Sequence, residues 1–368
     1  MPASKIRRSG RSSLKALLGL IIVALTLVET TSGSHARSRS TRKHPEPPPV
    51  AAQETPTLAA DARVNAAFLH VKGVGILRMQ DGGLSPVLQT QAPLRDMQLD
   101  AEGALWASLR DVGVIRHVGG KVVNLNQESF AKLAIRSPRD VWAINDRHGS
   151  VVHYDGNRWK TVRTRNSLAG AFEDNRLLDV VTDGRAVWVS SWNGLWRITG
   201  GRWTRVEPPA MAAAGNGAEG DVAPTPAFPL SLLVSRPGLI ACYLSGCFVS
   251  VESGWQPSHW PADKAHLQSA GSTNLVAGTG ADGKTVVIAR LDGSSETSKS
   301  ETLPANGIND IAIDATGRVW VATVATLITL DASGHTLQQW KPAAVDGQPG
   351  EIERVVIAGA GPKQLPAR

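Results

Sequence analysis

A four-strand pattern that recurs along the chain is the feature that most limits its possible folds. Residues 177–206 read LLDVVTDGRAVWVSSWNGLWRITGGRWTRV and contain four short apolar or alternating segments, separated by polar, Gly-containing corners. Such segments are typical of β-strands, and such corners are typical of tight turns. The stretch therefore predicts one antiparallel meander, which needs further copies of itself to bury its two faces.

The second strand of this meander recurs along the sequence. Four copies carry a tryptophan at their second position, namely Leu105–Ser108, Val141–Ile144, Val187–Ser190 and Val319–Ala322. Three weaker copies lack it, namely Ala66–Leu69, Leu239–Cys242 and Leu275–Gly278. A first strand precedes most copies by about ten residues, as in LRDMQLD at 94–100. Seven copies are therefore predicted, with Trp106, Trp142, Trp188 and Trp320 packed between adjacent copies.

The two ends of the array complement each other. The first copy has no first strand of its own, whereas Ile352–Ala358 superposes on the first strand at 94–100 and has no strand after it. A ring that borrows its last strand to complete its first sheet hides nearly all sheet edges. The sequence thus predicts an all-β fold, a single seven-bladed β-propeller whose C-terminal strand closes the first blade.

The N-terminal region has a different composition. Five basic residues precede the apolar run Ala16–Val28, and Ser34-His35-Ala36 supplies the small residues that signal peptidase reads. We expect a signal peptide over residues 1–36, with a membrane anchor at residues 14–28 as the alternative. A basic, Pro-rich linker is expected at 37–63, the propeller at 64–362 with an insert loop at 207–228, and a tail at 363–368.

The basic charge of the chain is concentrated in this region. Residues 1–43 hold nine Lys or Arg and one Glu, whereas the whole chain has a net charge of +7, so residues 44–368 carry a net charge of −1. A nucleic-acid-binding domain would place its basic residues on a folded face. We therefore expect no nucleic-acid partner, and membrane contact only through the signal segment or weakly through the basic linker.

The corner before two of the tryptophan copies has a sequence pattern that is similar to the repeats of known protein families. The pattern D-x-x-G-x-[LV]-W-[VA] occurs at 100–107 and 314–321, and a Gly-Leu corner follows a related copy at Gly194-Leu195. It resembles the propeller repeats in the periplasmic sensor parts of bacterial two-component regulators. It is also similar to the broader family of NHL-repeat and streptogramin lyase propellers. The lyase resemblance implies a His/Glu and metal constellation near the ring axis, to which no residue of this sequence is assigned.

Two local motifs suggest chemistry but have structural interpretations. Gly278–Thr285 matches the phosphate-binding G-x-x-x-x-G-K-[ST], yet the β-branched run Val286–Leu291 follows it where a helix is needed. A hairpin is predicted there, with nucleotide binding through Lys284 as a weaker alternative. The two cysteines, Cys242 and Cys247, flank a four-residue corner and should lie opposite one another, which predicts a structural disulfide.

One set of polar residues is expected to converge. The first strands of propeller blades line the central channel, and at one equivalent position they present Asp96, Lys132, Asp179, Asp310 and Arg354. Ser231 and Gln268 lie nearby in register. Two interpretations remain open: the ring of side chains is a binding mouth, or its members pair with neighbouring blades.

No catalytic residue, metal ligand or cofactor site is assigned from the sequence. We therefore expect an exported, non-catalytic propeller of the bacterial cell envelope, periplasmic or extracellular, that acts as a protein-interaction scaffold or ligand-sensing module. Its partner would be an envelope protein or a small ligand. The alternative is a metal-assisted lyase or hydrolase of the streptogramin lyase type.

Overall fold

The computed structural model divides the chain into two units, Met1–Glu54 and Thr55–Arg368. The described residues all belong to the second unit: 66–80, 83–164, 167–168, 175–209, 228–235, 238–243, 246–251, 253–258, 268–269, 275–280, 282–290, 298–303, 307–341 and 350–357. The predicted signal peptide, linker and C-terminal tail lie outside them, as does most of the predicted insert loop. Among the described residues, no helix has the length and apolar character needed to cross a membrane.

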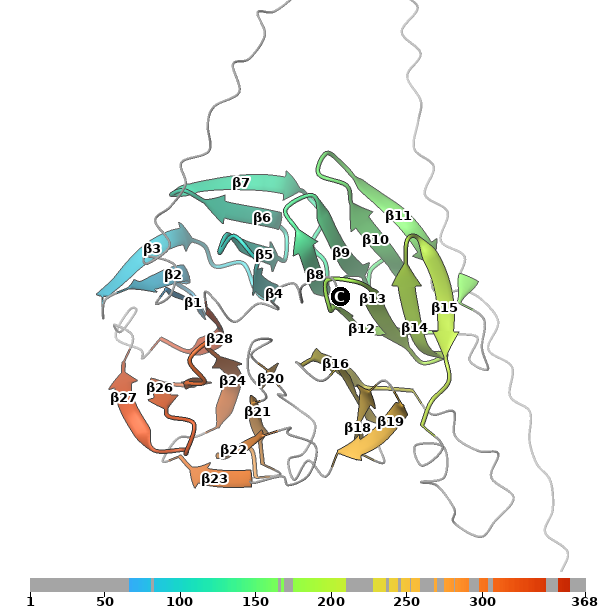
Figure 1. Cartoon of the computed structure of the whole chain (residues 1–368). Coiled ribbons are helices and arrows are strands. Elements are labelled where there is room, and N and C mark those ends of the chain that lie inside the picture. Colours follow the sequence, from blue (N-terminus) through green and yellow to red (C-terminus); the bar gives the residue numbers. More distant parts are fainter. Residues whose placement is uncertain are drawn as a thin grey trace, which may run out of the picture. The chain divides into compact units, whose positions relative to one another are not determined.

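The described residues form strands that assemble into sheets of four (Figure 1). The sheet that joins the two ends of the described chain has the order β28 (Ile352–Ile357), β1 (Ala67–Val71), β2 (Gly75–Gln80) and β3 (Gly83–Gln89). The next three sheets contain β4 (Leu94–Leu99), β5 (Leu105–Leu109), β6 (Gly113–Val118) and β7 (Lys121–Asn126); β8 (Lys132–Ser137), β9 (Asp140–Asn145), β10 (Ser150–Tyr154) and β11 (Trp159–Thr164); and β12 (Leu177–Thr182), β13 (Val187–Ser191), β14 (Gly194–Thr199) and β15 (Arg202–Val206).

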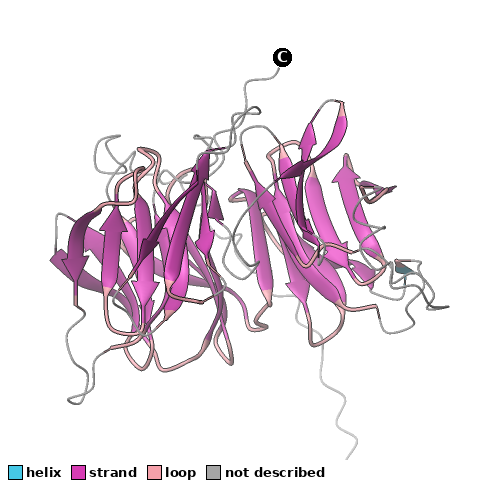
Figure 2. Ribbon diagram, turned by 90° about the horizontal axis from the view of Figure 1, so that it is seen from below, coloured by secondary structure: helices cyan, strands magenta, loops and turns pink. Residues whose placement is uncertain are grey.

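The C-terminal half adds three more sheets. They contain β16 (Ser231–Val234), β17 (Leu239–Tyr243), β18 (Gly246–Val251) and β19 (Gly254–Ser258); β20 (Gln268–Ser269), β21 (Leu275–Thr279), β22 (Thr285–Arg290) and β23 (Ser298–Thr302); and β24 (Ile308–Ile313), β25 (Val319–Thr323), β26 (Leu327–Leu330) and β27 (Thr336–Trp340). All neighbouring strands are antiparallel, and they run between two loop-bearing ends of the unit (Figure 2). The innermost strand of each sheet contacts that of the next, so the sheets are arranged as blades of a propeller.

The prediction of a seven-bladed propeller needs a correction, because the described residues form six regular blades. Six sheets are regular blades whose inner strands have four to six residues, whereas the sheet β20–β23 has an inner strand of two described residues. The sequence gives a physical reason. The segment HLQSAGST upstream of β21 lacks the alternating apolar residues of LLDVV, and β21 has valine where four other copies have tryptophan. This sheet therefore has fewer apolar groups with which to fix its inner strand.

The terminal strand β28 completes the first sheet by pairing with β1, which is the closure expected from the sequence. The register of this pairing corrects the predicted position of the first copy. Strand β1 begins at Ala67, and His70 lies opposite Arg354. The first copy of the repeat is thus Ala67–His70, one residue later than the predicted Ala66–Leu69. No tryptophan marks this strand, so the sequence offered no anchor for its register.

Glycine at the start of the third strand helps to set the corner geometry. Gly113 begins β6 with a φ of 99°, and a Cβ at this position would lie 1.8 Å from the carbonyl oxygen of Asn126. Only glycine allows both the positive φ and this close approach. Glycine opens β2, β14 and β18 as well.

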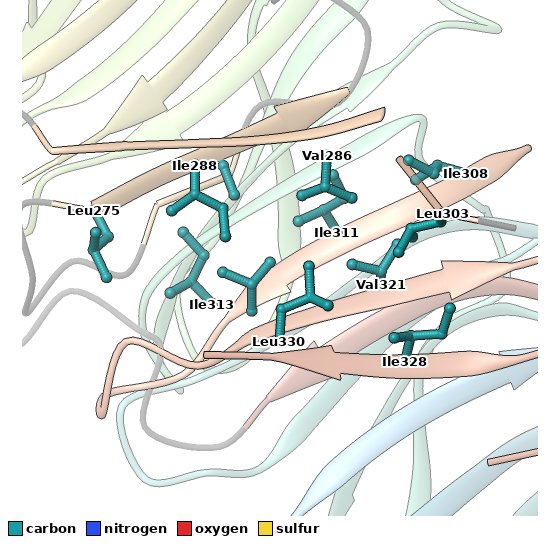
Figure 3. Packing of buried hydrophobic residues seen from close by; sticks show 12 residues of the cluster. Leu275, Val286, Ile288, Leu303, Ile308, Ile311, Ile313, Val321, Ile328 and Leu330 are labelled. Atoms are coloured by element: carbon teal, nitrogen blue, oxygen red, sulfur yellow. The ribbon is translucent and has the colours of Figure 1, made fainter. Parts of the chain in front are cut away.

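The apolar core lies between neighbouring blades. In one cluster, Ile288 of β22, Ile311 of β24 and Val321 of β25 pack together, and all three are at most 3% exposed (Figure 3). Similar clusters occur at the other blade boundaries that the structure describes. Each blade therefore buries its faces against its two neighbours, which holds the inner strands and their polar side chains in place.

Candidate functional site: the channel ring

Five charged side chains occupy equivalent positions on five inner strands, as the sequence predicted, and we call them the channel ring. Each lies opposite the fourth residue of the second-strand copy beside it, in the pairs Asp96 and Ser108, Lys132 and Ile144, Asp179 and Ser190, Asp310 and Ala322, and Arg354 and His70. The three carboxylates are buried, whereas Lys132 and Arg354 are half-buried. The ring therefore exposes its cations more than its anions.

The two uncharged candidates differ from each other. Ser231 lies opposite Cys242, which is the ring position in its blade. Gln268 lies opposite Ala277, one residue away from the position that would match the other strands. The predicted register is thus wrong for Gln268, in the one blade whose inner strand is shortened.

Each carboxylate of the ring binds the next blade. It accepts a hydrogen bond from the backbone amide that follows the equivalent position on the neighbouring inner strand: Leu133 to Asp96 at 2.7 Å, Leu232 to Asp179 at 2.9 Å, and Val355 to Asp310 at 2.9 Å. A buried amide without a partner is costly, so these bonds stabilise the contacts between inner strands. The pairing interpretation thus accounts for the three aspartates.

Arg354 joins two further blades. Its Nη2 lies 3.0 Å from Oδ1 of Asp96, and its Nε lies 3.5 Å from Oδ2 of Asp310. The charge of Asp310, followed by those of Asp96 and Asp179, raises the pKa of Arg354 against the opposing effect of burial. Arg354 therefore stays charged and neutralises carboxylates on both sides of β28.

Lys132 has a different environment. Its ammonium group makes no hydrogen bond or ion pair with another residue in the described part of the chain. Its charge still acts on Asp179, whose pKa is raised mainly by burial, while Lys132 and the amides of Leu232 and Val180 oppose that rise and Asp96 adds to it. The ammonium of Lys132 is thus the charged group of the ring that can pair with a ligand in the channel.

A buried histidine lies behind the ring and was missed from the sequence. His70 is 2% exposed, and its Nδ1 lies 3.0 Å from Oε2 of Glu353 on β28. Burial lowers the pKa of His70, while Glu353 partly offsets this. The one-residue shift in the predicted first copy hid its equivalence to Ser108.

The four predicted blade tryptophans share one arrangement. The indole Nε1 of each donates to an aspartate at the corner before its strand or, for Asp140, at the first residue of the strand, in the pairs Trp106 and Asp100 at 3.0 Å, Trp142 and Asp140 at 2.8 Å, Trp188 and Asp183 at 3.1 Å, and Trp320 and Asp314 at 3.2 Å. Each ring also packs with residues of the following blade. These residues therefore hold the corners and the blade boundaries, and they lie away from the channel ring.

The cysteine prediction is confirmed. Cys242 and Cys247 face each other on β17 and β18 and form a disulfide, with Cα atoms 4.0 Å apart. Both side chains are buried. The bond links the second and third strands of one blade.

The phosphate-loop match has the predicted hairpin structure. Strands β21 and β22 pair on either side of it, and Asp282 accepts hydrogen bonds from the amides of Lys284 and Thr285. No helix follows in the described residues, so the amides needed for a phosphate cradle are not assembled there. Within the same described part, no group of three or more His, Cys, Asp or Glu is placed to hold a metal ion.

Comparison with known proteins supports the fold and the repeat. Residues 302–325, which include β24 and β25, match the sequence profile of the two component regulator propeller, in agreement with the resemblance noted in the sequence. The comparison with curated proteins gives no match.

Solved structures with similar folds are distant in sequence. Apo AztD from Citrobacter koseri aligns with a TM-score of 0.56 at 13% identity, over 80% of this chain and 99% of that protein. Streptogramin B lyase aligns with a TM-score of 0.52 at 11% identity, over 80% and 95% of the two chains. The extracellular domain of BT4673 from B. thetaiotaomicron gives 0.49 at 14% identity, over 78% and 40%. The chain is thus an all-β propeller that carries a two-component-regulator propeller repeat.

Proposed function

We propose that this protein is an exported, non-catalytic recognition module of the cell envelope that binds a small polar ligand with an anionic group at the channel ring. One observation carries the proposal. The three carboxylates of the ring are buried and bonded to neighbouring blades, whereas Lys132 is half-buried and free of ion pairs within the described residues. The cations are therefore the ring charges that are more exposed to the channel.

The surrounding groups favour a ligand with more than one polar atom. Arg354 is held between two aspartates, so it offers a fixed and partly exposed donor edge in the same ring as the ammonium of Lys132. Convergent polar groups at a concave position are the usual basis of ligand selection. Buried carboxylates nearby would also favour a ligand that carries a positive group.

The location rests on independent features. A disulfide joins the two cysteines, and disulfides persist mainly in oxidising compartments outside the cytosol. The sequence also begins with the pattern of a signal peptide. These features support a periplasmic or extracellular site of action. An envelope protein that presents a carboxylate could bind to the same cations of the channel ring.

The test compares Lys132→Glu with the wild-type protein. A thermal-shift screen of small anionic and zwitterionic compounds, together with a pull-down from the envelope fraction, identifies what the wild type binds. We expect Lys132→Glu to lose that binding by tenfold or more, because the ammonium becomes a carboxylate. Lys121→Glu on the outer strand β7 makes the same charge change far from the ring and serves as the control.

Two results would contradict the proposal. One is equal binding by wild type and Lys132→Glu, which would place the site elsewhere. The other is loss of binding in both variants, which would indicate a dependence on total charge alone.

A further inference from the structure

A second polar surface lies between the outer strands of two blades, remote from the channel. Strands β11 and β15 are the outermost strands of adjacent sheets and lie next to each other (Figure 1). Between them is an open groove of about 530 Å³, lined by Thr161, Arg163, Thr164, Ser167, Gly201 and Trp203 among others. Its volume is within the ~300–1,000 Å³ typical of small-ligand sites. We call it the Arg163 groove.

Arg163 is positioned by an aromatic ring. Its guanidinium carbon lies 5.6 Å from the centre of the Trp203 ring. This cation–π contact restrains the side chain and leaves the N–H edge of the guanidinium free to donate. The guanidinium group of Arg163 makes no hydrogen bond or ion pair with any residue that the structure describes. Its donors are therefore oriented, exposed and unused.

The groove lining carries positive charge, because it includes Arg163 and no Asp or Glu. Arg202 and Arg205 on β15 are exposed and have no ion-pair partner in the described part of the chain. An anion near Arg163 thus meets no competing carboxylate in the groove lining.

The rest of the lining is rich in hydroxyl groups. Thr161, Thr164 and Ser167 are exposed, and Ser167 Oγ donates to the carbonyl oxygen of Thr164 at 2.8 Å. Hydroxyl groups both donate and accept, so they can bond to the hydroxyl groups of a ligand. A planar guanidinium matches a carboxylate through two parallel hydrogen bonds. The groove thus combines an oriented carboxylate receptor with partners for hydroxyl groups.

We propose that the Arg163 groove binds an acidic glycan, through a uronate carboxylate on Arg163 and sugar hydroxyls on the threonine and serine side chains. The groove is open to solvent, so a chain of sugars can occupy it and extend beyond it. This site is separate from the channel ring, and it can be present whether or not the ring binds a ligand.

The test is isothermal titration of the full chain with tri-galacturonate, an oligosaccharide with one carboxylate on each sugar. We expect the wild type to bind it and Arg163→Gln to bind at least tenfold more weakly, with Arg163→Lys intermediate because it keeps the charge but loses the planar fork. Arg197→Gln is the matched control, because Arg197 lies 5.3 Å from the ring centre of Trp188 in the same kind of contact but does not line the groove.

The comparison ligands separate the alternatives. Maltotriose has the hydroxyl groups without the carboxylates and should not bind measurably. Competition by inorganic phosphate at concentrations equal to that of tri-galacturonate would show a general anion site and overturn the glycan assignment. Absence of tri-galacturonate binding, or equal weakening by Arg163→Gln and Arg197→Gln, would overturn the groove itself.

Discussion

The carboxylate of Asp179 on β12 accepts a hydrogen bond from the backbone amide of Leu232 on β16, at 2.9 Å, across the boundary between two blades. These residues are far apart in the sequence, and the bond closes one section of the ring of inner strands. Asp96 and Asp310 make the same bond to their own following blades. The channel aspartates are thus structural members of the ring, which directs functional tests toward the cations.

Replacing Asp179 by alanine should destabilise the propeller. The substitution leaves the amide of Leu232 buried without an acceptor, at a cost of about 1–3 kcal/mol in the free energy of unfolding. Asp179→Asn keeps an acceptor oxygen, so its free energy of unfolding should fall by a smaller amount. Urea unfolding of the two variants measures the difference. If Asp179→Ala unfolded at the wild-type urea concentration, the inter-blade bond would have no energetic importance.

Asp179 should also make stability depend on pH. Burial raises its folded-state pKa above the ordinary 3.8, so the folded protein holds this proton more tightly than the unfolded chain does. The contribution of Asp179 to the free energy of unfolding is therefore greatest below pH 3.8. This contribution falls as the pH rises through the raised folded-state pKa. Comparison with Asp179→Asn isolates the contribution, because the amide does not titrate. The stability of wild type relative to this variant should fall with rising pH, and a constant difference would contradict the predicted shift.

Asp331, at the corner between β26 and β27, should make stability depend on pH in the opposite direction. Hydrogen bonds from Ser333, chiefly, and from the amide of His335 lower the pKa of Asp331 from 3.8 to about 2. Its stabilising contribution is present above pH 3.8 and is lost as pH falls toward 2. Asp331→Asn should therefore show a shallower loss of stability over this acid range, which thermal unfolding at a series of pH values can measure. An identical slope in both proteins would show that the corner does not retain these bonds.

Trp106 should contribute both packing and a hydrogen bond. The side chain is fully buried, and its Nε1 donates to Asp100 at 3.0 Å. Trp106→Ala should lower the free energy of unfolding by about 3–5 kcal/mol, because it leaves a cavity between two blades. Trp106→Phe keeps most of the packing and should cost less. Denaturant unfolding tests this order, and wild-type stability of the alanine variant would contradict the blade-boundary role.

The disulfide should stabilise the blade that contains it by a modest amount. The closed loop between Cys242 and Cys247 is short, so its loss should cost about 2 kcal/mol, toward the lower end of the range for disulfides. Cys242→Ala/Cys247→Ala should unfold more readily than wild type and should not respond to reductant. Wild type should respond, and equal midpoints with and without reductant would show that the bond does not stabilise the blade.

Much of the fold could be predicted because it depends on local patterns. The alternation and corner residues of 177–206 predicted β12 to β15, and the recurrence of Val-Trp-Val and its variants placed the second strands of the regular blades. The cysteine pair followed from the same alignment, since opposed positions on a hairpin are close in space. Strand registers are least predictable where the tryptophan is absent, as the shift at His70 and the register of Gln268 show.

The sequence by itself determined the strand pattern, the closure by Ile352–Ile357 and the convergence of five charged side chains on the inner strands. Only the tertiary structure decided what those charges do, because the partners of Asp96, Asp179 and Asp310 are backbone amides of other blades, which carry no sequence signal. The same holds for the groove, where Arg163 and Trp203 meet across two outer strands. Contacts between distant strands depend on how the blades pack, and a linear pattern records only the residues that enter that packing.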